Sequence, residues 1–199
     1  MAARSGNVAC VRILIHHPHI QLDAQDVEGL TPLHHACFHG FADIVLALRE
    51  ADFCIANTEG DFPLHLAASE YKTSVFTALK KDQVFNNKCK RSSKFKSQQD
   101  SDGNTLLHIA VDSEESEVVD WCLELGFDLR ARNKLGMNSL HVAARRGSVK
   151  IAQKLVVREQ ELGNSVQEFI NLGNNYEATP LYLASKFNQS EMVKYLLEQ

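Results

Sequence analysis

Apolar residues recur along the chain in short blocks with helical spacing. Leu33, Ala36 and Cys37 fall at positions i, i+3 and i+4, which places them on one face of a helix. A turn signal follows at Gly40, and a second apolar stripe begins at Ile44. The pattern therefore predicts pairs of short helices joined by tight turns.

The helix pairs belong to an internal repeat. Five segments align on one fixed leucine: Gly29–Ala36, Gly60–Ala67, Gly103–Ala110, Gly136–Ala143 and Glu177–Ala184. That leucine recurs after 31, 43, 33 and 41 residues. Two of the gaps lie near a unit of about 33 residues, and the other two leave insertions of about ten and about eight residues.

Each part of the unit has a structural role. Glycine permits the positive φ of a tight turn, and Thr followed by Pro supplies a helix N-cap and a first-turn residue. Several copies depart from this pattern, and we expect looser turns, or turns of another type, where the turn glycine is missing. The departures are Tyr71, Glu114, Asn188 and Glu177 for glycine, Ser139 for proline, and Tyr182 for histidine.

The two ends of the chain fall within the repeat. Ala2 and Ala3 occupy the register positions of Ala143 and Ala144, so residue 1 lies inside a unit. The far end stops at Leu196–Gln199 without a polar capping unit. Terminal units of a stacked array normally need a polar outer face, so we expect a piece of a longer array.

The unit resembles the ankyrin repeat, whose signature D-x-x-G-x-T-P-L-H-x-A-A-x-x-G is nearly spelled out by Asp26–Gly40. The resemblance implies an all-α solenoid of stacked helix-turn-helix units with hairpin loops. The expected repeats are 1–25 (partial), 26–57, 58–80, 100–133, 134–156 and 174–199, with insertions near 81–99 and 157–173.

Four histidines recur with the repeat: His34, His65, His108 and His141. They lie one per layer, roughly 10 Å apart for packed helices, which is too far to share a metal ion. The ankyrin resemblance implies instead that each links the hairpin of one layer to the next by hydrogen bonds.

A second histidine group, His16, His17 and His19, flanks Pro18. Three imidazoles in four residues suit a transition metal or titration near neutral pH. No Cys or carboxylate stands at ligand spacing, so we favour a plain exposed loop over a metal site.

Composition restricts the class of protein. No apolar run approaches the ~20 residues of a membrane span, and the amino end lacks the apolar core of a secretory signal. The odd count of five cysteines, without a CxxC pair, fits reduced cytosolic thiols. No nucleotide loop, HExxH or nucleophile motif is present. We therefore expect no enzyme, no catalytic residue and no cofactor.

Positive charge concentrates in one insertion. From Lys80 to Lys96, seven cations face one carboxylate, so this stretch carries +6 and the remainder −10. We do not expect a nucleic-acid-binding face over the whole surface. We expect a solvated loop here. The alternatives are an anionic lipid or polyphosphate contact, phosphorylation at Ser92 or Ser93, a localisation tag, or a clamp onto the acidic stretch Asp112–Asp120.

Cys89 lies among Lys88, Lys90 and Arg91, an environment that favours the thiolate. The sequence therefore predicts that Cys89 reacts first with a small electrophile. Other cysteines at stripe positions, such as Cys37 and Cys122, are expected to be buried packing residues.

Stacked hairpins and first helices form a concave face that suits protein partners. We expect Leu30, Phe38, Met137 and Arg146 to be exposed anchors of such binding. The full set of candidate protein-binding positions is Val27, Glu28, Leu30, Phe38, His39, Glu59, Asp61, Ser69, Glu70, Leu135, Met137, Arg145, Arg146, Lys186 and Phe187.

A narrower resemblance is to the amino-terminal ankyrin array of TRPA-type cation channels. It lies in the irregular spacing, the long insert before Asp102–Asn104, the run Val118–Gly126 and the late segment Thr179–Phe187. It implies the cytosolic piece of a homotetrameric, non-selective cation channel. The alternative is a soluble scaffold that gathers partner proteins.

Overall fold

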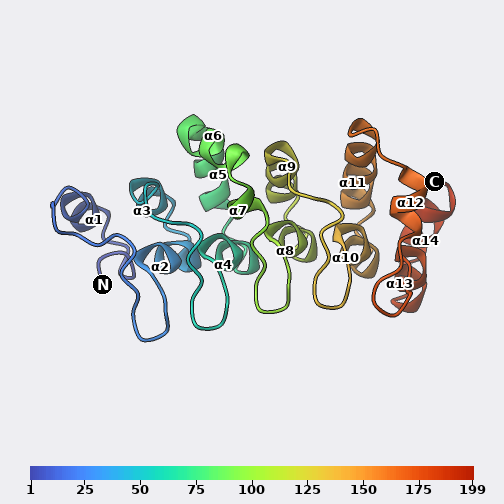
Figure 1. The fold of residues 1–199 in the computed structure, drawn as a ribbon, viewed down its shortest axis with the longest axis horizontal. Coiled ribbons are helices and arrows are strands. Elements are labelled where there is room, and N and C mark those ends of the chain that lie inside the picture. Colours follow the sequence, from blue (N-terminus) through green and yellow to red (C-terminus); the bar gives the residue numbers. More distant parts are fainter.

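The computed structural model describes residues 1–199 and contains helices but no strand, which confirms the all-α prediction (Figure 1). The helices are α1 Val8–Leu14, α2 Pro32–His39, α3 Ala42–Ala47, α4 Pro63–Ser69, α5 Thr73–Lys81, α6 Gln83–Arg91, α7 Ser93–Lys96, α8 Leu106–Asp112, α9 Ser116–Leu125, α10 Ser139–Arg146, α11 Val149–Glu161, α12 Val166–Asn171, α13 Pro180–Lys186 and α14 Ser190–Leu197.

The helices stack in two rows. Inner helices α2, α4, α8, α10 and α13 pack side by side, and α3, α5, α9, α11 and α14 form the outer row. Helix α1 packs on α3 and continues the outer row. Hairpin loops project from the inner row to one side, and the two chain ends lie at opposite ends of the stack (Figure 1).

The local sequence explains each inner helix. In α2, the Thr31 side chain caps the helix, Pro32 follows, and the His34 ring bonds back to the Thr31 amide. Four of the five fixed leucines, such as Leu33, are buried in one hydrophobic core that runs the length of the stack, and Leu181 is partly buried against it. Gly40 ends the helix at φ 75°, a conformation that costs glycine little.

The turns without glycine keep the same conformation, so the prediction of looser or different turns is wrong. Tyr71, Glu114, Glu177 and Asn188 have φ of 56°, 57°, 57° and 58°, beside glycines at 72° to 87° in the other units. The packed helices on either side fix the path of the chain through the turn. A left-handed residue with a side chain costs about 1–2 kcal/mol, and the packing of the stack offsets that cost.

Replacing Tyr71 with glycine is expected to raise the free energy of unfolding by about 1 kcal/mol, because glycine relieves the left-handed strain. Tyr71 is 63% exposed, so little packing is lost. Tyr71→Ala, which removes the ring but keeps the strain, is the control and should give no such gain. Urea unfolding would measure both variants, and equal stability of the two would contradict the strain argument.

The first insertion is helical, and the prediction of a solvated loop there is wrong. Asp82 caps α6 by accepting from the Phe85 amide at 2.9 Å, and Ser92 caps α7. Phe85, Cys89 and Phe95 turn inward and are 3–4% exposed. The sequence obscures this apolar face, because polar residues surround Cys89 and Phe95, and the apolar residue next to Phe85, Val84, faces outward.

The second insertion is also ordered. Helix α11 runs into it as far as Glu161, and α12 packs against α11 and α13 with Phe169 fully buried. Arg130 reaches from the preceding layer to the buried Glu159 at 2.5 Å and lies 5.8 Å from the centre of the Phe169 ring. This insertion is therefore tied to the repeat before it.

Candidate functional site

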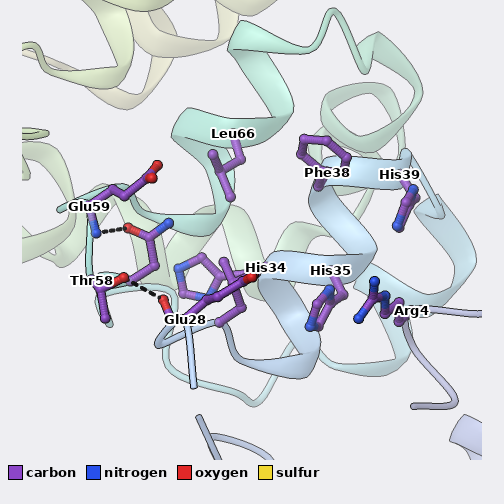
Figure 2. Close-up of a pocket in the computed structure, with 11 residues that line it drawn as sticks. Arg4, Glu28, His34, His35, Phe38, His39, Thr58, Glu59 and Leu66 are labelled. Carbon is purple, nitrogen blue, oxygen red and sulfur yellow. Dashed lines mark hydrogen bonds between the residues drawn. The ribbon is translucent and has the colours of Figure 1, made fainter. Parts of the chain in front are cut away.

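A groove opens on the concave face where the second and third layers meet (Figure 2). Its cavity has a volume of about 470 Å³. The residues that line it come from the hairpins, from α2 and α4, and from the amino-terminal segment: Arg4, Glu28, Leu30, His34, His35, Phe38, His39, Asn57, Thr58, Glu59 and Leu66. We refer to this set as the concave groove.

The hairpin at the groove is rigidly hydrogen-bonded. The carboxylate of Asp26 accepts from the amides of Glu28 and Leu30 at 3.0 and 2.9 Å and pairs with His35 Nε2 at 2.9 Å. These contacts, led by the His35 hydrogen bond, hold the pKa of Asp26 below its usual value. The Thr58 hydroxyl donates to the Glu28 carbonyl at 2.9 Å (Figure 2). The floor of the groove is therefore preorganised.

Aromatic side chains stand at the end of α2. The Phe38 ring is 43% exposed and contacts the His39 ring edge-on, with centroids 5.1 Å apart. Figure 2 shows Phe38 and His39 beside each other, with Arg4 near His35. An exposed aromatic ring in a groove that Arg4, Glu28 and Glu59 also line is typical of a protein-binding hot spot.

Three of the four periodic histidines make the predicted links between layers. His34, His108 and His141 use Nε2 to contact the carbonyl oxygens of the next hairpin at 3.1, 2.9 and 3.1 Å. His65 does not, since neither of its ring nitrogens has a hydrogen-bond partner although the side chain is buried. Its N-cap position holds Phe62, so no hydroxyl or amide oxygen orients the ring as in the other copies.

Burial lowers the pKa of His65 and of His141 to about 4. In the unfolded chain these side chains titrate near 6.5. The unfolded state therefore binds more protons between these values, and the free energy of unfolding falls as the pH drops from about 6.5 to about 4.

We expect His65→Leu to weaken this pH dependence, because leucine does not titrate. Urea midpoints of the variant and the wild type, compared at about pH 7 and about pH 4.5, would measure the difference. An unchanged pH dependence would show that His65 takes up its proton equally in both states.

Most of the candidate binding positions lie on the surface. Val27, Glu28, Phe38, His39, Glu59, Ser69, Glu70, Leu135, Arg146, Lys186 and Phe187 are exposed, and Leu30, Asp61 and Arg145 are half-buried. The concave groove brings together Glu28, Leu30, Phe38, His39 and Glu59. Lys186 and Phe187 stand on α13 and its C-cap, four layers further along the stack.

Two predicted anchors are engaged within the protein. Met137 is 5% exposed, so the prediction that it is exposed is wrong, because the residue after the hairpin glycine packs against the neighbouring layer. Its carbonyl oxygen is the contact of His108. Arg146 donates two hydrogen bonds to the Asp112 carboxylate, at 2.8 and 2.6 Å. Arg145 donates a third to the same carboxylate at 2.6 Å.

The sequence prediction missed several residues that line the concave groove. Arg4 holds the register position of Arg145, so the repeat alignment carries a signal for it. Asn57 and Thr58 belong to the next hairpin and reach the groove only because the layers stack.

Cys89 is buried, and the prediction of a reactive thiolate there is wrong. Burial raises its pKa to about 12, and Lys88 opposes that shift only in part. Burial also raises the pKa of Cys37 and Cys122. Cys10 is exposed.

A maleimide reagent is therefore expected to label Cys10 first, with Cys89 modified only after unfolding. Mass spectrometry of the protein after timed exposure, in buffer and in denaturant, would give the order. Labelling of Cys89 in the native protein as fast as Cys10 would contradict the burial argument.

The remaining candidates are dispersed. His16, His17 and His19 are exposed, and the rings of His17 and His19 stand 5.8 Å apart. No group of three or more potential metal ligands converges. The acidic stretch does not clamp the basic insertion, since Asp112 pairs with the two arginines and Asp120 with Lys154. No helix has both the length and the apolar character to cross a membrane.

Comparison with known families agrees with this architecture. A model described as ankyrin repeats (3 copies) matches residues 50–133, 77–169 and 117–199, and one described as ankyrin repeats (many copies) matches residues 1–49. The chain belongs to the ankyrin-repeat family, and it is a protein-interaction module of that family.

Two of the individual relatives are cation channels. Human transient receptor potential cation channel subfamily A member 1 is 30% identical over 179 residues, which are 89% of this chain and 15% of that protein. Its Drosophila melanogaster counterpart is 26% identical over 180 residues, 86% of this chain and 14% of that protein. The chain thus spans a small part of these channels, and its similarity to their ankyrin region confirms that resemblance.

Two further matches show how widely the repeat occurs. Human protein phosphatase 1 regulatory subunit 27 is 38% identical over 76 residues, 37% of this chain and 49% of that protein. The crystal structure of an ankyrin repeat domain from Acinetobacter baumannii AYE superposes with a TM-score of 0.78 at 21% identity, covering all of this chain and 95% of that one. The latter similarity supports the fold.

Proposed function

We propose that this chain is the cytosolic amino-terminal ankyrin region of a TRPA-like non-selective cation channel, and that it recognises protein partners through the concave groove. The similarity to channel relatives over 86–89% of the chain supports the proposal that it is part of such a channel. The exposed Phe38 ring and the hydrogen-bonded hairpin line the same groove and support recognition of partners through it. In such a parent the array would be present in four copies.

Crosslinking of partner proteins in cells tests whether the concave groove binds them. Proteins crosslinked to the wild-type array in cells would be compared with those crosslinked to Phe38→Ala and to Val157→Ala, which is 53% exposed on the outer helix α11. For partners of the groove, we expect the crosslinked amount to fall at least tenfold with Phe38→Ala and to stay unchanged with Val157→Ala. If both variants retained every partner equally, the proposal that the concave groove binds partners would be overturned.

Fractionation of the full-length protein from cells tests whether it is an integral membrane protein. Release by detergent, and not by carbonate or high-salt washes, is the expected result for a channel. Recovery in the soluble fraction would favour the second candidate, a soluble scaffold. The similarity to a protein phosphatase 1 regulatory subunit favours that candidate and makes a phosphatase one partner to look for.

The basic insertion supports a second contact. Lys88, Lys90 and Arg91 remain exposed on α6 without an ion-pair partner, which suits an anionic lipid or polyphosphate. Ser93 is exposed, whereas Ser92 is half-buried and caps α7. Phosphorylation at Ser93 would reduce the positive charge of this surface.

A further inference from the structure

One boundary between layers lacks the hydrogen bonds that join the others. At three boundaries, a hairpin amide donates to a carbonyl of the preceding hairpin at 2.9 to 3.1 Å. Between the hairpins Asn57–Asp61 and Asp100–Asn104, which we call the central seam, the corresponding Ser101 amide and Glu59 carbonyl form no such bond. The unpartnered His65 belongs to this same seam.

A cavity of about 710 Å³ opens along the central seam. Asp61, Asp100 and Asp102 line it from the two hairpins, and His65 lines it from α4. Asp100 is used by its own turn, accepting from the amides of Asp102 and Asn104. The carboxylates of Asp61 and Asp102 have neither an ion pair nor a hydrogen bond within the protein.

These carboxylates repel one another. Burial raises the pKa of Asp61, and the charges of Asp100, Glu59 and Asp102 add to that shift. Two cations line the same cavity, but Arg145 is held by Asp112 at 2.6 Å. Lys134 stands on the following hairpin and balances one charge. The hairpin end of the cavity therefore keeps an excess of negative charge.

Apolar surface lies beside the acidic end. Leu135 is 46% exposed, and Leu135 and Val142 line the cavity. A long side chain with an aliphatic stem and a cationic head would bury its stem here and place its head between the carboxylates.

We propose that the central seam binds an arginine side chain presented by a partner segment. The guanidinium donates to the carboxylates of Asp61 and Asp102, and its planar fork suits paired carboxylate oxygens. His65 lines the same cavity, but both of its ring nitrogens are buried, so the guanidinium contacts the carboxylates and not the ring. The ligand thus supplies the donors that the seam lacks. This assignment rests on the proposed protein-binding function and names the chemistry of the partner.

The test titrates the labelled array with an acetylated, amidated pentapeptide of alanines with a central arginine, followed by two-dimensional amide NMR. An identical peptide with citrulline, which keeps the shape and loses the charge, is the control ligand. We expect saturable shifts at the amides of 101–104 and at Leu135 with the arginine peptide, and none with the citrulline peptide. Equal shifts with both peptides would overturn the proposal.

Variants separate this site from general attraction to an acidic protein. Asp61→Asn/Asp102→Asn should weaken binding at least tenfold, whereas Glu117→Gln/Glu198→Gln, with the same change in net charge on exposed residues elsewhere, should change it less than twofold. The single variant Asp102→Asn is a second test if the double variant unfolds, because that exposed side chain makes no hydrogen bond.

An equal loss in both double variants would overturn the central seam as the site. If the arginine peptide fails while capture still depends on Phe38, the inference falls and the proposed function stands. If capture also fails to depend on Phe38, both fall.

Discussion

Replacing Phe85 with alanine is expected to lower the free energy of unfolding by about 3 kcal/mol or more, because it removes a buried ring from a packed aromatic cluster. Phe85 stacks on Trp121 with a centroid distance of 6.4 Å and an interplanar angle of 12°, and it contacts Phe53 at 4.6 Å. These contacts join the insertion to two layers of the stack. The loss should therefore reach beyond α6 into the repeats on either side.

Trp121 is the only tryptophan of the chain, so its fluorescence reports urea unfolding at this cluster. Val84→Ala is the matched control, because Val84 precedes Phe85 on α6 and is 69% exposed. It should change stability by less than about 0.5 kcal/mol. If both substitutions had the same small effect, the insertion would not contribute to the core.

Replacing Arg130 with methionine is expected to destabilise the fold by about 3 kcal/mol, because it leaves the carboxylate of Glu159 buried without its cation. Glu159 is 1% exposed, and Arg130 contacts it through Nε. Arg130 also donates to the Ser165 carbonyl at 3.2 Å. The substitution thus detaches the second insertion from the preceding layer.

The double variant Arg130→Met/Glu159→Met should recover most of the loss, because no charge then remains buried. Arg158→Met is the control on the same helix, because its partner Glu161 is 57% exposed. Ion pairs with a solvated carboxylate contribute about 0–1 kcal/mol. Thermal unfolding of the three variants measures the series. A similar loss for Arg158→Met and Arg130→Met would show that burial of Glu159 is not the cause.

The concave groove could be predicted only in part. The register predicts that Phe38 and Glu28 are exposed, because the repeat shows which positions are not needed for packing or turns. Leu30 and Met137 hold the same register position directly after the hairpin glycine, but Leu30 is half-buried and Met137 is only 5% exposed. The register gives the direction of a side chain within one unit, and the spacing between units decides whether it is exposed.

The sequence by itself determined the repeat, the all-α class and the paired helices, because each depends on residues within one unit of about 33 positions. Only the tertiary structure decided the rest. It ordered the basic insertion, buried Cys89, fixed the left-handed turns at residues such as Tyr71, and left His65 without a partner. These outcomes depend on contacts between layers, where desolvation and packing outweigh the local preference of a residue for charge, exposure or backbone conformation.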